Sequence, residues 1–462
     1  MAISYETAQH LLSVHGQGHL LRFWERLDEA QRRSLLSQIE ALDFETLAQM
    51  QAALQLRSRT VAYDDIEPAP VLSLTAEERA DMRRVGEEVL RSGEVGVVLV
   101  AGGQGSRLGF EGPKGAFPIG PITNAPLFAV HARKLLALKT RYGFQLPFYI
   151  MTSEANDAQT REFFEEHAYF GLVPEGVHFF VQGMWPALFE DGRIVLERPD
   201  RIFFSPDGHG GVLAALRASG MLADMEKRGL RMIFYFQVDN PLVEIAEPVC
   251  LGVHQTRQAD ITVKVCAKRD PEEGLGVVAV RGARTLIVEY TELSREQKHA
   301  RLPNGDLKFR FGSVAIHVFS LSFLQREAGV RLPLHLAHKK VPYCDDEGRI
   351  IRPDKPNAYK FEKFIFDVLP DAERVVNLEF RREDEFSPVK NATGHDSPDT
   401  ARRDLMRKYA RWLTECGITV PRGANGELIY RVEIDPAFAA DVETFREKLP
   451  PDLKITGDLL LA

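Results

Sequence analysis

A glycine-rich segment followed by two cationic residues is the part of this sequence that points most directly to chemistry. Residues 96–115 read GVVLVAGGQGSRLGFEGPKG. Gly102 and Gly103 have no Cβ, so the backbone N–H groups there can approach phosphate oxygens closely. Arg107 and Lys114 follow in the same segment and would bring positive charge to those phosphates. The segment therefore predicts a site for a nucleoside triphosphate.

Two widespread glycine motifs do not fit this segment. The dinucleotide fingerprint G-x-G-x-x-G has two residues between its second and third glycines. Three residues separate Gly105 from Gly109 in this sequence. A Walker phosphate loop has Gly-Lys followed by Ser or Thr, whereas Lys114 follows Pro113 and precedes Gly115. A tight strand-to-helix turn that binds no ligand is the alternative interpretation. The missing fingerprint also argues against a nicotinamide-dependent oxidoreductase.

Strand-like and helix-like segments alternate from about residue 94, and they must position the glycine-rich segment. Apolar, β-branched or aromatic runs predict buried strands at 95–101, 147–153, 179–183, 231–240, 261–267 and 375–380. This alternation predicts an α/β fold with a mostly parallel sheet that helices cover on both faces. Ligands of such sheets bind beyond the carboxyl ends of the strands, so the glycine-rich segment and Asp239 should lie along one edge.

The two ends of the chain have different patterns from this central region. Apolar residues recur at helical spacing between 35 and 54, and Asp43 is a candidate helix N-cap. We therefore predict a helical N-terminal domain over 1–75 and a central domain over 76–395. Beyond a turn-rich stretch, residues 396–462 predict a small α+β domain.

The composition argues against several classes of partner. The 58 basic and 66 acidic residues give a net charge of −8, and no basic run is interleaved with aromatic residues, so we expect no nucleic-acid partner. Four scattered cysteines predict reduced core residues instead of a disulfide framework or a metal site. No apolar run approaches about eighteen residues and no signal peptide is evident, so we expect a soluble cytoplasmic protein that does not span a membrane.

The same segments resemble a known family of transferases. AGGQGSRLG followed by PKG is similar to the signature of the uridylyltransferases that join UTP to a sugar 1-phosphate, especially the UDP-N-acetylglucosamine pyrophosphorylases. Further matches follow in the same order through QGMWPAL, SPDGHGG, VDNPLV, GVVAV, VEYTEL, RPDKPNAYKFEKFIFD and REDEFSPVKNA. The resemblance covers roughly residues 90–410. It implies the nucleotide-diphospho-sugar transferase fold, a Rossmann-like mixed central sheet with helices on both faces, and makes 76–395 the nucleotidyltransferase domain.

The reaction that the resemblance implies needs positioning and charge more than a protein nucleophile. A phosphate oxygen of the sugar 1-phosphate attacks the α-phosphorus of UTP in line, and pyrophosphate leaves on the far side. The resemblance implies four cationic residues at the phosphates: Arg107, Lys114, Lys360 and Lys390. It also makes Asp239 the ligand of Mg²⁺, which binds oxygen ligands. In the alternative, Asp239 only caps the turn before Pro241.

Some of these residues also have a purely structural interpretation. Arg107 could be a solvated loop cation. Lys360 could be a surface lysine, because 360–369 has the spacing of an amphipathic helix. His335 and His338 could hold a metal on a helix, but no third ligand stands near them in sequence, so exposed helix residues are the favoured interpretation.

The resemblance also implies residues that contact UTP and the sugar. These are Ala101, Gly102, Gly103, Gln182, Gly208, His209, Gly276, Glu289 and Ser313. Gln182 matches the position that reads uracil, and Glu289 matches an acid that accepts hydrogen bonds from sugar hydroxyls. His209 and Ser313 stand where the acetylglucosamine enzymes have Asn. The resemblance therefore favours N-acetylglucosamine 1-phosphate as the partner of UTP and leaves glucose 1-phosphate, a broad specificity and a non-catalytic UDP-sugar sensor as alternatives.

Overall fold

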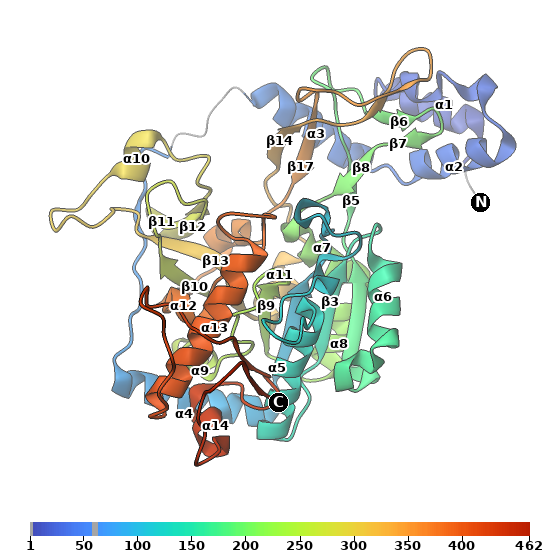
Figure 1. The fold of residues 1–462 in the computed structure, drawn as a ribbon. Coiled ribbons are helices and arrows are strands. Elements are labelled where there is room, and N and C mark those ends of the chain that lie inside the picture. The colour runs from blue at the N-terminus through green and yellow to red at the C-terminus, as the bar shows by residue number, and fades with distance from the viewer. Residues whose placement is uncertain (1–2, 58–62) are drawn as a thin grey trace. The chain divides into compact units, whose positions relative to one another are not determined.

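The chain folds into two compact units. The computed structural model describes residues 3–57 and 63–462. Unit 1 is built from three stretches of chain: Met1–Ala62, Gln182–Gly211 and Arg331–Asp367. Unit 2 is built from the remaining three: Tyr63–Val181, Val212–Val330 and Val368–Ala462 (Figure 1). The domain boundaries expected from the sequence stay a prediction.

A ten-stranded sheet forms the centre of unit 2 in the described part of the chain. Its strands are β1 (Glu67–Pro68), β2 (Val95–Val100), β3 (Phe148–Thr152), β4 (Val177–Val181), β9 (Met232–Gln237), β10 (Ile261–Ala267), β11 (Val277–Arg281), β12 (Arg284–Val288), β13 (Phe311–Ser320) and β18 (Val375–Glu379). The main path runs β1-β11-β13-β9-β2-β3-β4, with β10 beside β13, β12 beside β11, and β18 beside β10. The six strands predicted from apolar runs are all present in this sheet.

The sheet is mixed, which corrects the expectation of a mostly parallel one. β4, β3, β2 and β9 run parallel, and so do β10 and β18. Between these two groups, β13 runs antiparallel to both β9 and β10. Gly312, Ser313 and His317 interrupt the apolar pattern of β13, which explains why no strand was predicted there.

Helices cover both faces of the sheet. A large apolar core on one face includes residues of α4 (Ala76–Ser92), α5 (Leu127–Tyr142), α6 (Asp157–Glu166), α9 (Pro248–Arg257) and α13 (Pro398–Glu415). The opposite face carries α8 (Met221–Lys227), where Tyr149 of β3 donates a hydrogen bond to Asp224 over 2.7 Å. α7 (Val212–Ala218) and α11 (Leu321–Glu327) pack with α8.

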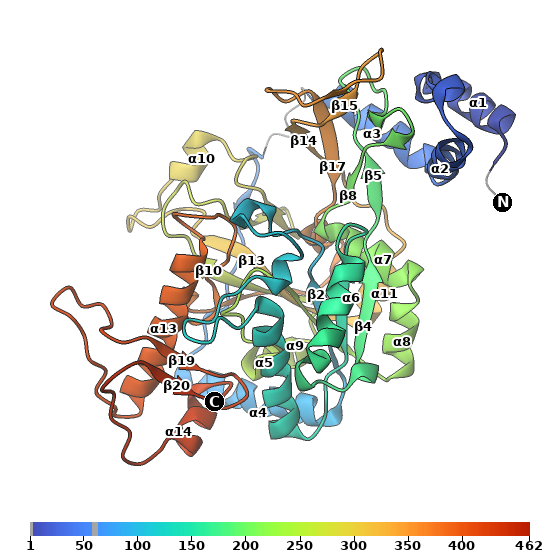
Figure 2. The same ribbon diagram turned by 45° about the vertical axis from the view of Figure 1, so that its right-hand side comes forward.

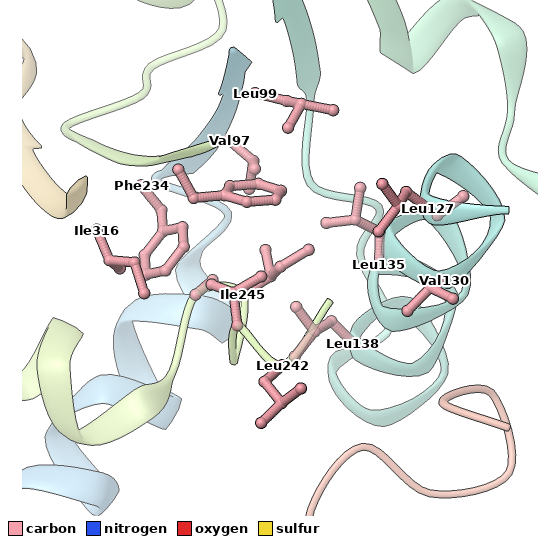
Figure 3. Close-up of a cluster of buried hydrophobic side chains, with 14 of the residues drawn as sticks. Val97, Leu99, Leu127, Val130, Leu135, Leu138, Phe234, Leu242, Ile245 and Ile316 are labelled. Atoms are coloured by element: carbon pink, nitrogen blue, oxygen red, sulfur yellow. The ribbon is translucent and has the colours of Figure 1, made fainter. Parts of the chain in front are cut away.

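The core of unit 2 follows from strand alternation. Two residues of β2, Val97 and Leu99, point toward the same helical layer, because residues two apart share a face of a strand. Phe234 of β9 pairs with Val97 across the two strands and points toward that layer as well. Figure 3 shows them near Leu135 and Leu138 of α5. This packing holds β2 and β9 in place against the helices. It thereby also fixes the start of the loops that follow the carboxyl ends of these two strands.

The shorter elements of unit 2 lie outside this layer structure. They are α10 (Arg295–His299), α12 (Arg382–Glu385), α14 (Val442–Lys448), β19 (Val432–Ile434) and β20 (Leu459–Leu461). β19 and β20 form a parallel pair of their own, and Val432 and Ile434 join the main core with Phe445 of α14. No helix in the described ranges 3–57 and 63–462 is long and apolar enough to cross a membrane.

In the described residues of unit 1, α-helices are combined with short β-hairpins (Figure 2). The helices are α1 (Tyr5–Val14), α2 (Glu29–Glu40) and α3 (Phe44–Leu56), and Asp43 caps α3 as predicted. The hairpins pair β5 (Met184–Pro186) with β8 (Phe204–Pro206), β6 (Leu196–Arg198) with β7 (Arg201–Ile202), β14 (His335–Lys339) with β17 (Ala358–Glu362), and β15 (Tyr343–Cys344) with β16 (Ile350–Ile351). Ile39 and Met50 share one buried cluster with Leu188 and Phe361.

Two helix predictions fail in unit 1. Lys360 lies on β17, so the expected amphipathic helix over 360–369 is wrong, although residues 365–371 form a 3₁₀ helix. His335 and His338 lie on β14 and not on a helix. In both segments the cross-strand pairing of β14 with β17 overrides the helical spacing of the apolar residues.

Close helix contact in unit 2 depends on two glycines. A Cβ at Gly86 of α4 would lie 1.8 Å from the Pro248 carbonyl oxygen, and one at Gly252 of α9 would lie 1.9 Å from the Met82 carbonyl oxygen. The two backbones can therefore touch only while both positions lack a side chain.

We predict that Gly86→Ala lowers the free energy of unfolding of the protein by about 1–3 kcal/mol or more, because the added methyl group must push α4 and α9 apart. Gly457→Ala is the matched control, since nothing lies within 4 Å of the position that its Cβ would take. Thermal unfolding followed by circular dichroism measures both variants. Equal midpoints for the two would contradict the tight contact.

Candidate active site

The loop after β2 folds back on itself and returns Lys114 to its own beginning. The Gly105 N–H donates to the Gly112 carbonyl over 2.9 Å, and the Lys114 N–H donates to the Gly103 carbonyl over 3.0 Å. Gly115 packs against Phe128, where a Cβ would lie 2.1 Å from the ring. The backbone of Lys114 is therefore fixed beside the glycines, as a phosphate site requires.

Side chains from the loop after β3 hold the glycine-rich loop through its carbonyl groups. Asn156 Nδ2 donates to the Ala101 carbonyl over 2.9 Å and to the Gly103 carbonyl over 3.3 Å. Ser153 Oγ donates to the Gly102 carbonyl over 2.8 Å. The Ala101 N–H continues the sheet by donating to the Met151 carbonyl. These bonds occupy the loop's carbonyl oxygens, which favours presentation of its glycine N–H groups to a ligand.

Lys114 and Asp239 come together at the carboxyl edge of the sheet. Asp239 lies two residues beyond β9, and the Val238 N–H pairs with the Val100 carbonyl at the end of β2. Lys114 Nζ is 3.7 Å from Asp239 Oδ2, and the two side chains are only 17% and 11% exposed. Arg107 is exposed on the 3₁₀ turn Ser106–Leu108. The structure thus pairs two of the predicted site residues and leaves Arg107 at the surface of the loop.

Lys390 belongs to a segment that contacts the Asp239 backbone. The Val389 N–H donates to the Asp239 carbonyl over 2.8 Å, and the Lys390 N–H donates to the Asp396 carbonyl over 2.7 Å. Lys390 therefore directly follows Val389, which is hydrogen-bonded to Asp239, although Lys390 and Asp239 are far apart in sequence.

The residues at this edge fit a magnesium ion that is also held by substrate. Among the described residues no group of three or more His, Cys, Asp or Glu side chains could hold a metal. Mg²⁺ commonly takes one or two protein carboxylates and completes its shell with phosphate oxygens and water. A single carboxylate of Asp239 beside the glycine-rich loop matches that donor set.

Three residues predicted to contact the substrates are neighbours at one end of β11, β12 and β13. The Ser313 N–H donates to the Gly276 carbonyl over 2.9 Å. A Cβ at Gly276 would lie 3.1 Å from Glu289 Oε1, so only a glycine leaves that carboxylate its present position. Glu289 follows the last residue of β12. Gly276, Glu289 and Ser313 therefore form one small polar surface within unit 2.

His209 is part of an aromatic cluster in unit 1. Its ring stacks on Phe364, with centroids 5.2 Å apart and planes inclined by 18°, and lies 5.7 Å from the Phe366 ring. The Ile365 N–H donates to His209 Nδ1 over 3.3 Å, which favours the tautomer with its proton on Nε2. Gly208, just before it, has φ of +85°, a conformation that favours glycine.

Asp207 is a buried acid next to His209 that the sequence prediction missed. It is 3% exposed, and burial raises the pKa of its carboxyl group to about 7, while Lys363 opposes that rise. Its Oδ1 has no hydrogen-bond partner among the described residues. A Cβ at Gly211 would lie 2.1 Å from this oxygen, so the carboxyl group depends on that glycine. The only signal in the sequence was its place before Gly208 in SPDGHGG.

The other predicted residues of unit 1 are buried or have local partners. Gln182 is buried at 7% exposure. Lys360 Nζ lies over the Phe203 ring at 4.9 Å, and burial lowers the pKa of its ammonium group. His335 pairs with Asp367 over 2.9 Å, and His338 stacks on Tyr359. The contacts of His335 and His338 indicate structural roles for both histidines. The phosphate role of Lys360 stays a prediction.

Comparison with known proteins extends the likeness to nearly the whole chain. The model of the family described as UTP-glucose-1-phosphate uridylyltransferase matches residues 42–454. UDP-N-acetylhexosamine pyrophosphorylase-like protein 1 of Xenopus tropicalis is 39% identical over 439 residues, which are 90% of this chain and 86% of that protein. UDP-N-acetylglucosamine pyrophosphorylase of Saccharomyces cerevisiae is 34% identical over 438 residues, covering 89% of this chain and 92% of the yeast protein.

A solved structure agrees with the fold. The crystal structure of the uridine diphosphate N-acetylglucosamine pyrophosphorylase from Trypanosoma brucei in complex with an inhibitor matches with a TM-score of 0.83 at 29% identity. The match covers 97% of this chain and 96% of that one. The mixed α/β fold and the resemblance found in the sequence are both confirmed, and the chain belongs to the UTP-glucose-1-phosphate uridylyltransferase family of UDP-sugar pyrophosphorylases.

Proposed function

We propose that this protein is a Mg²⁺-dependent uridylyltransferase that joins UTP to a sugar 1-phosphate, with N-acetylglucosamine 1-phosphate as the favoured sugar. The observation that carries this proposal is the 3.7 Å approach of Lys114 to Asp239 beside the glycine-rich loop. A cation, a carboxylate for a metal and backbone N–H groups are the components that phosphoryl transfer requires from a protein.

The chemical step is an in-line displacement at the α-phosphorus of UTP. A phosphate oxygen of the sugar 1-phosphate forms the new P–O bond while the bond to pyrophosphate breaks, and pyrophosphate carries away the electron pair. The glycine N–H groups and Lys114 would bind the triphosphate and stabilise the charge on the departing pyrophosphate. Mg²⁺ on Asp239 would neutralise phosphate charge and polarise the phosphoryl oxygens.

The remaining residues would orient the two substrates. Lys390 follows the residue that is bonded to the Asp239 backbone, which supports a role at the phosphates beside the metal. Glu289 and Ser313 share the polar surface around Gly276, which supports recognition of sugar hydroxyls by that surface. Gln182 is proposed to read the uracil edge, and Lys360 to meet a phosphate. Arg107, exposed on its 3₁₀ turn, would close on the triphosphate from solvent.

The names of the relatives support N-acetylglucosamine 1-phosphate as the sugar, because the yeast and trypanosomal proteins are named as pyrophosphorylases for that sugar nucleotide. His209 and Ser313 differ from the Asn residues of the acetylglucosamine enzymes, so glucose 1-phosphate is the alternative substrate. The frog relative is named only as a pyrophosphorylase-like protein. If the protein bound a UDP-sugar without turnover, a non-catalytic sensor would therefore be favoured over an enzyme.

We predict that Lys114→Ala and Asp239→Ala each lower the turnover number at least about 100-fold, since each removes charge stabilisation that acts on the transition state. Pyrophosphate release from UTP, Mg²⁺ and N-acetylglucosamine 1-phosphate measures the effect. Lys227→Ala and Asp81→Ala remove the same charges from exposed positions and serve as controls. Near-wild-type rates in both site variants, with wild-type circular dichroism, would show that the assigned site is wrong.

We also predict that His209→Asn raises the preference for N-acetylglucosamine 1-phosphate over glucose 1-phosphate about tenfold or more, because an amide replaces an imidazole at the position where the acetylglucosamine enzymes have Asn. The measurement is the ratio of kcat/KM for the two sugars. His338→Asn is the control, since that histidine has no proposed role. An unchanged ratio in His209→Asn would remove this position from sugar selection.

A further inference from the structure

A buried cluster of charged and amide side chains lies directly behind Asp239 in unit 2. Lys264, in the middle of β10, has a side chain only 1% exposed. Its Nζ is 2.5 Å from Glu385 Oε2 and 3.4 Å from Glu247 Oε2. A buried ammonium group is tolerated only when it is paired and hydrogen-bonded, so these contacts fix Glu385 of α12 against the sheet.

Asn240 extends this cluster to the metal-binding position. Its side chain is buried, and its Nδ2 donates to the Glu385 carbonyl over 2.6 Å. Its Oδ1 accepts from the Ser387 N–H over 3.1 Å. Together with the bond from the Val389 N–H to the Asp239 carbonyl, three hydrogen bonds join residues 239–240 to residues 385–389.

The far end of the same loop is also held by this cluster. Glu247 accepts from the Val249 and Cys250 N–H groups at the start of α9, over 3.1 and 3.0 Å. Lys264 therefore contacts one carboxylate that caps α9 and another in the segment that leads to Lys390. The chain that follows Asp239 is anchored at both of its ends, and both anchors meet at one ammonium group.

We propose that Asn240 and Lys264 are positioning residues that hold Asp239 and Lys390 at a fixed separation, so that a magnesium ion and a phosphate group meet both at once. The inference rests on the proposed function. Neither residue needs to touch substrate. Lys264 holds Glu385. Asn240, which directly follows Asp239, is bonded to residues 385 and 387 of the segment that leads to Lys390.

Alignment within a fraction of an ångström is worth a large factor in phosphoryl transfer, because a misplacement of about 1 Å can cost roughly 100-fold in rate. A role in folding alone would instead lower stability and leave the coupling between metal and nucleotide intact. The two roles therefore differ in how strongly Mg²⁺ increases the affinity for UTP.

The test is calorimetric titration of the full-length protein with UTP, with Mg²⁺ and with EDTA. In EDTA, we expect Asn240→Ala to bind UTP as tightly as the wild type does. The factor by which Mg²⁺ increases the affinity for UTP should be about tenfold smaller in the variant than in the wild type. Asn377→Ala is the matched control, because Asn377 is an equally buried amide at 4% exposure and donates to the Pro70 carbonyl away from this loop. It should keep the full Mg²⁺ effect.

Two further variants separate positioning from folding. Asn240→Asp keeps an acceptor for the Ser387 N–H but has no amide to donate to the Glu385 carbonyl, so it should show a smaller loss than Asn240→Ala. Lys264→Met combined with Glu385→Gln removes both charges of the pair and keeps the net charge of the cluster, and it should reproduce the loss of Mg²⁺ coupling.

The outcomes are distinct. A wild-type Mg²⁺ effect in folded Asn240→Ala and in the Lys264→Met/Glu385→Gln variant would overturn the positioning role. An equal loss in Asn377→Ala would also overturn it, because the effect would then come from general destabilisation. If the wild type itself bound UTP no more tightly with Mg²⁺, the metal role in the proposed function would fail, and the positioning role, which rests on it, would fail with it.

Discussion

The parallel pairing of β2 with β9 is the constraint on which the rest of the site depends. Val100 and Gln237 are opposite each other at the carboxyl ends of these strands, and the Val238 N–H extends the ladder by one more bond. A shift of one residue would turn Asp239 away from the loop that carries Lys114 and would also move Phe234 and Val97 out of the core. Core packing and site geometry are therefore set by the same register.

Burial gives the charges at this edge their strength. Lys114 and Asp239 are largely removed from water, and electrostatic interactions are stronger where the effective dielectric constant is low. The cost of keeping charged groups there is offset by pairing, both between these two residues and in the Lys264 cluster behind them. In the proposed function, charge is thus arranged before substrate arrives, which is how preorganised sites lower a barrier.

The strands and loop that carry the candidate site could be predicted from the sequence because they are local. The glycine-rich loop, Lys114 and the six strands with apolar runs are defined by short segments, and the predictions for those strands are confirmed. The failures have a common physical cause. β13 carries polar residues inside a buried strand, and Lys360 and His335 sit in segments whose apolar spacing fits a helix but whose partners across the hairpin make them strands.

The residues that the sequence did not reveal act through contacts distant in the chain. Asn240 and Glu385 are 145 residues apart, and Lys264 and Glu385 are 121 apart, so no local pattern could join them. The lysine inside the apolar run ITVKVCA was the one visible sign, because a charge in a buried strand must find a partner. Asp207 was similarly hidden, since its burial depends on Gly183 and Gly211 on either side of it in the sequence.

The reverse reaction is the sharpest test of the proposed uridylyl transfer, because it needs the same phosphate, metal and sugar contacts in one step. The measurement is the appearance of UTP when the protein is mixed with UDP-N-acetylglucosamine, pyrophosphate and Mg²⁺, with UDP-glucose in parallel. We expect UTP to form with UDP-N-acetylglucosamine, and none to form once EDTA removes the metal. Binding of both UDP-sugars without any UTP would contradict it and would leave a protein that senses UDP-sugars without making them.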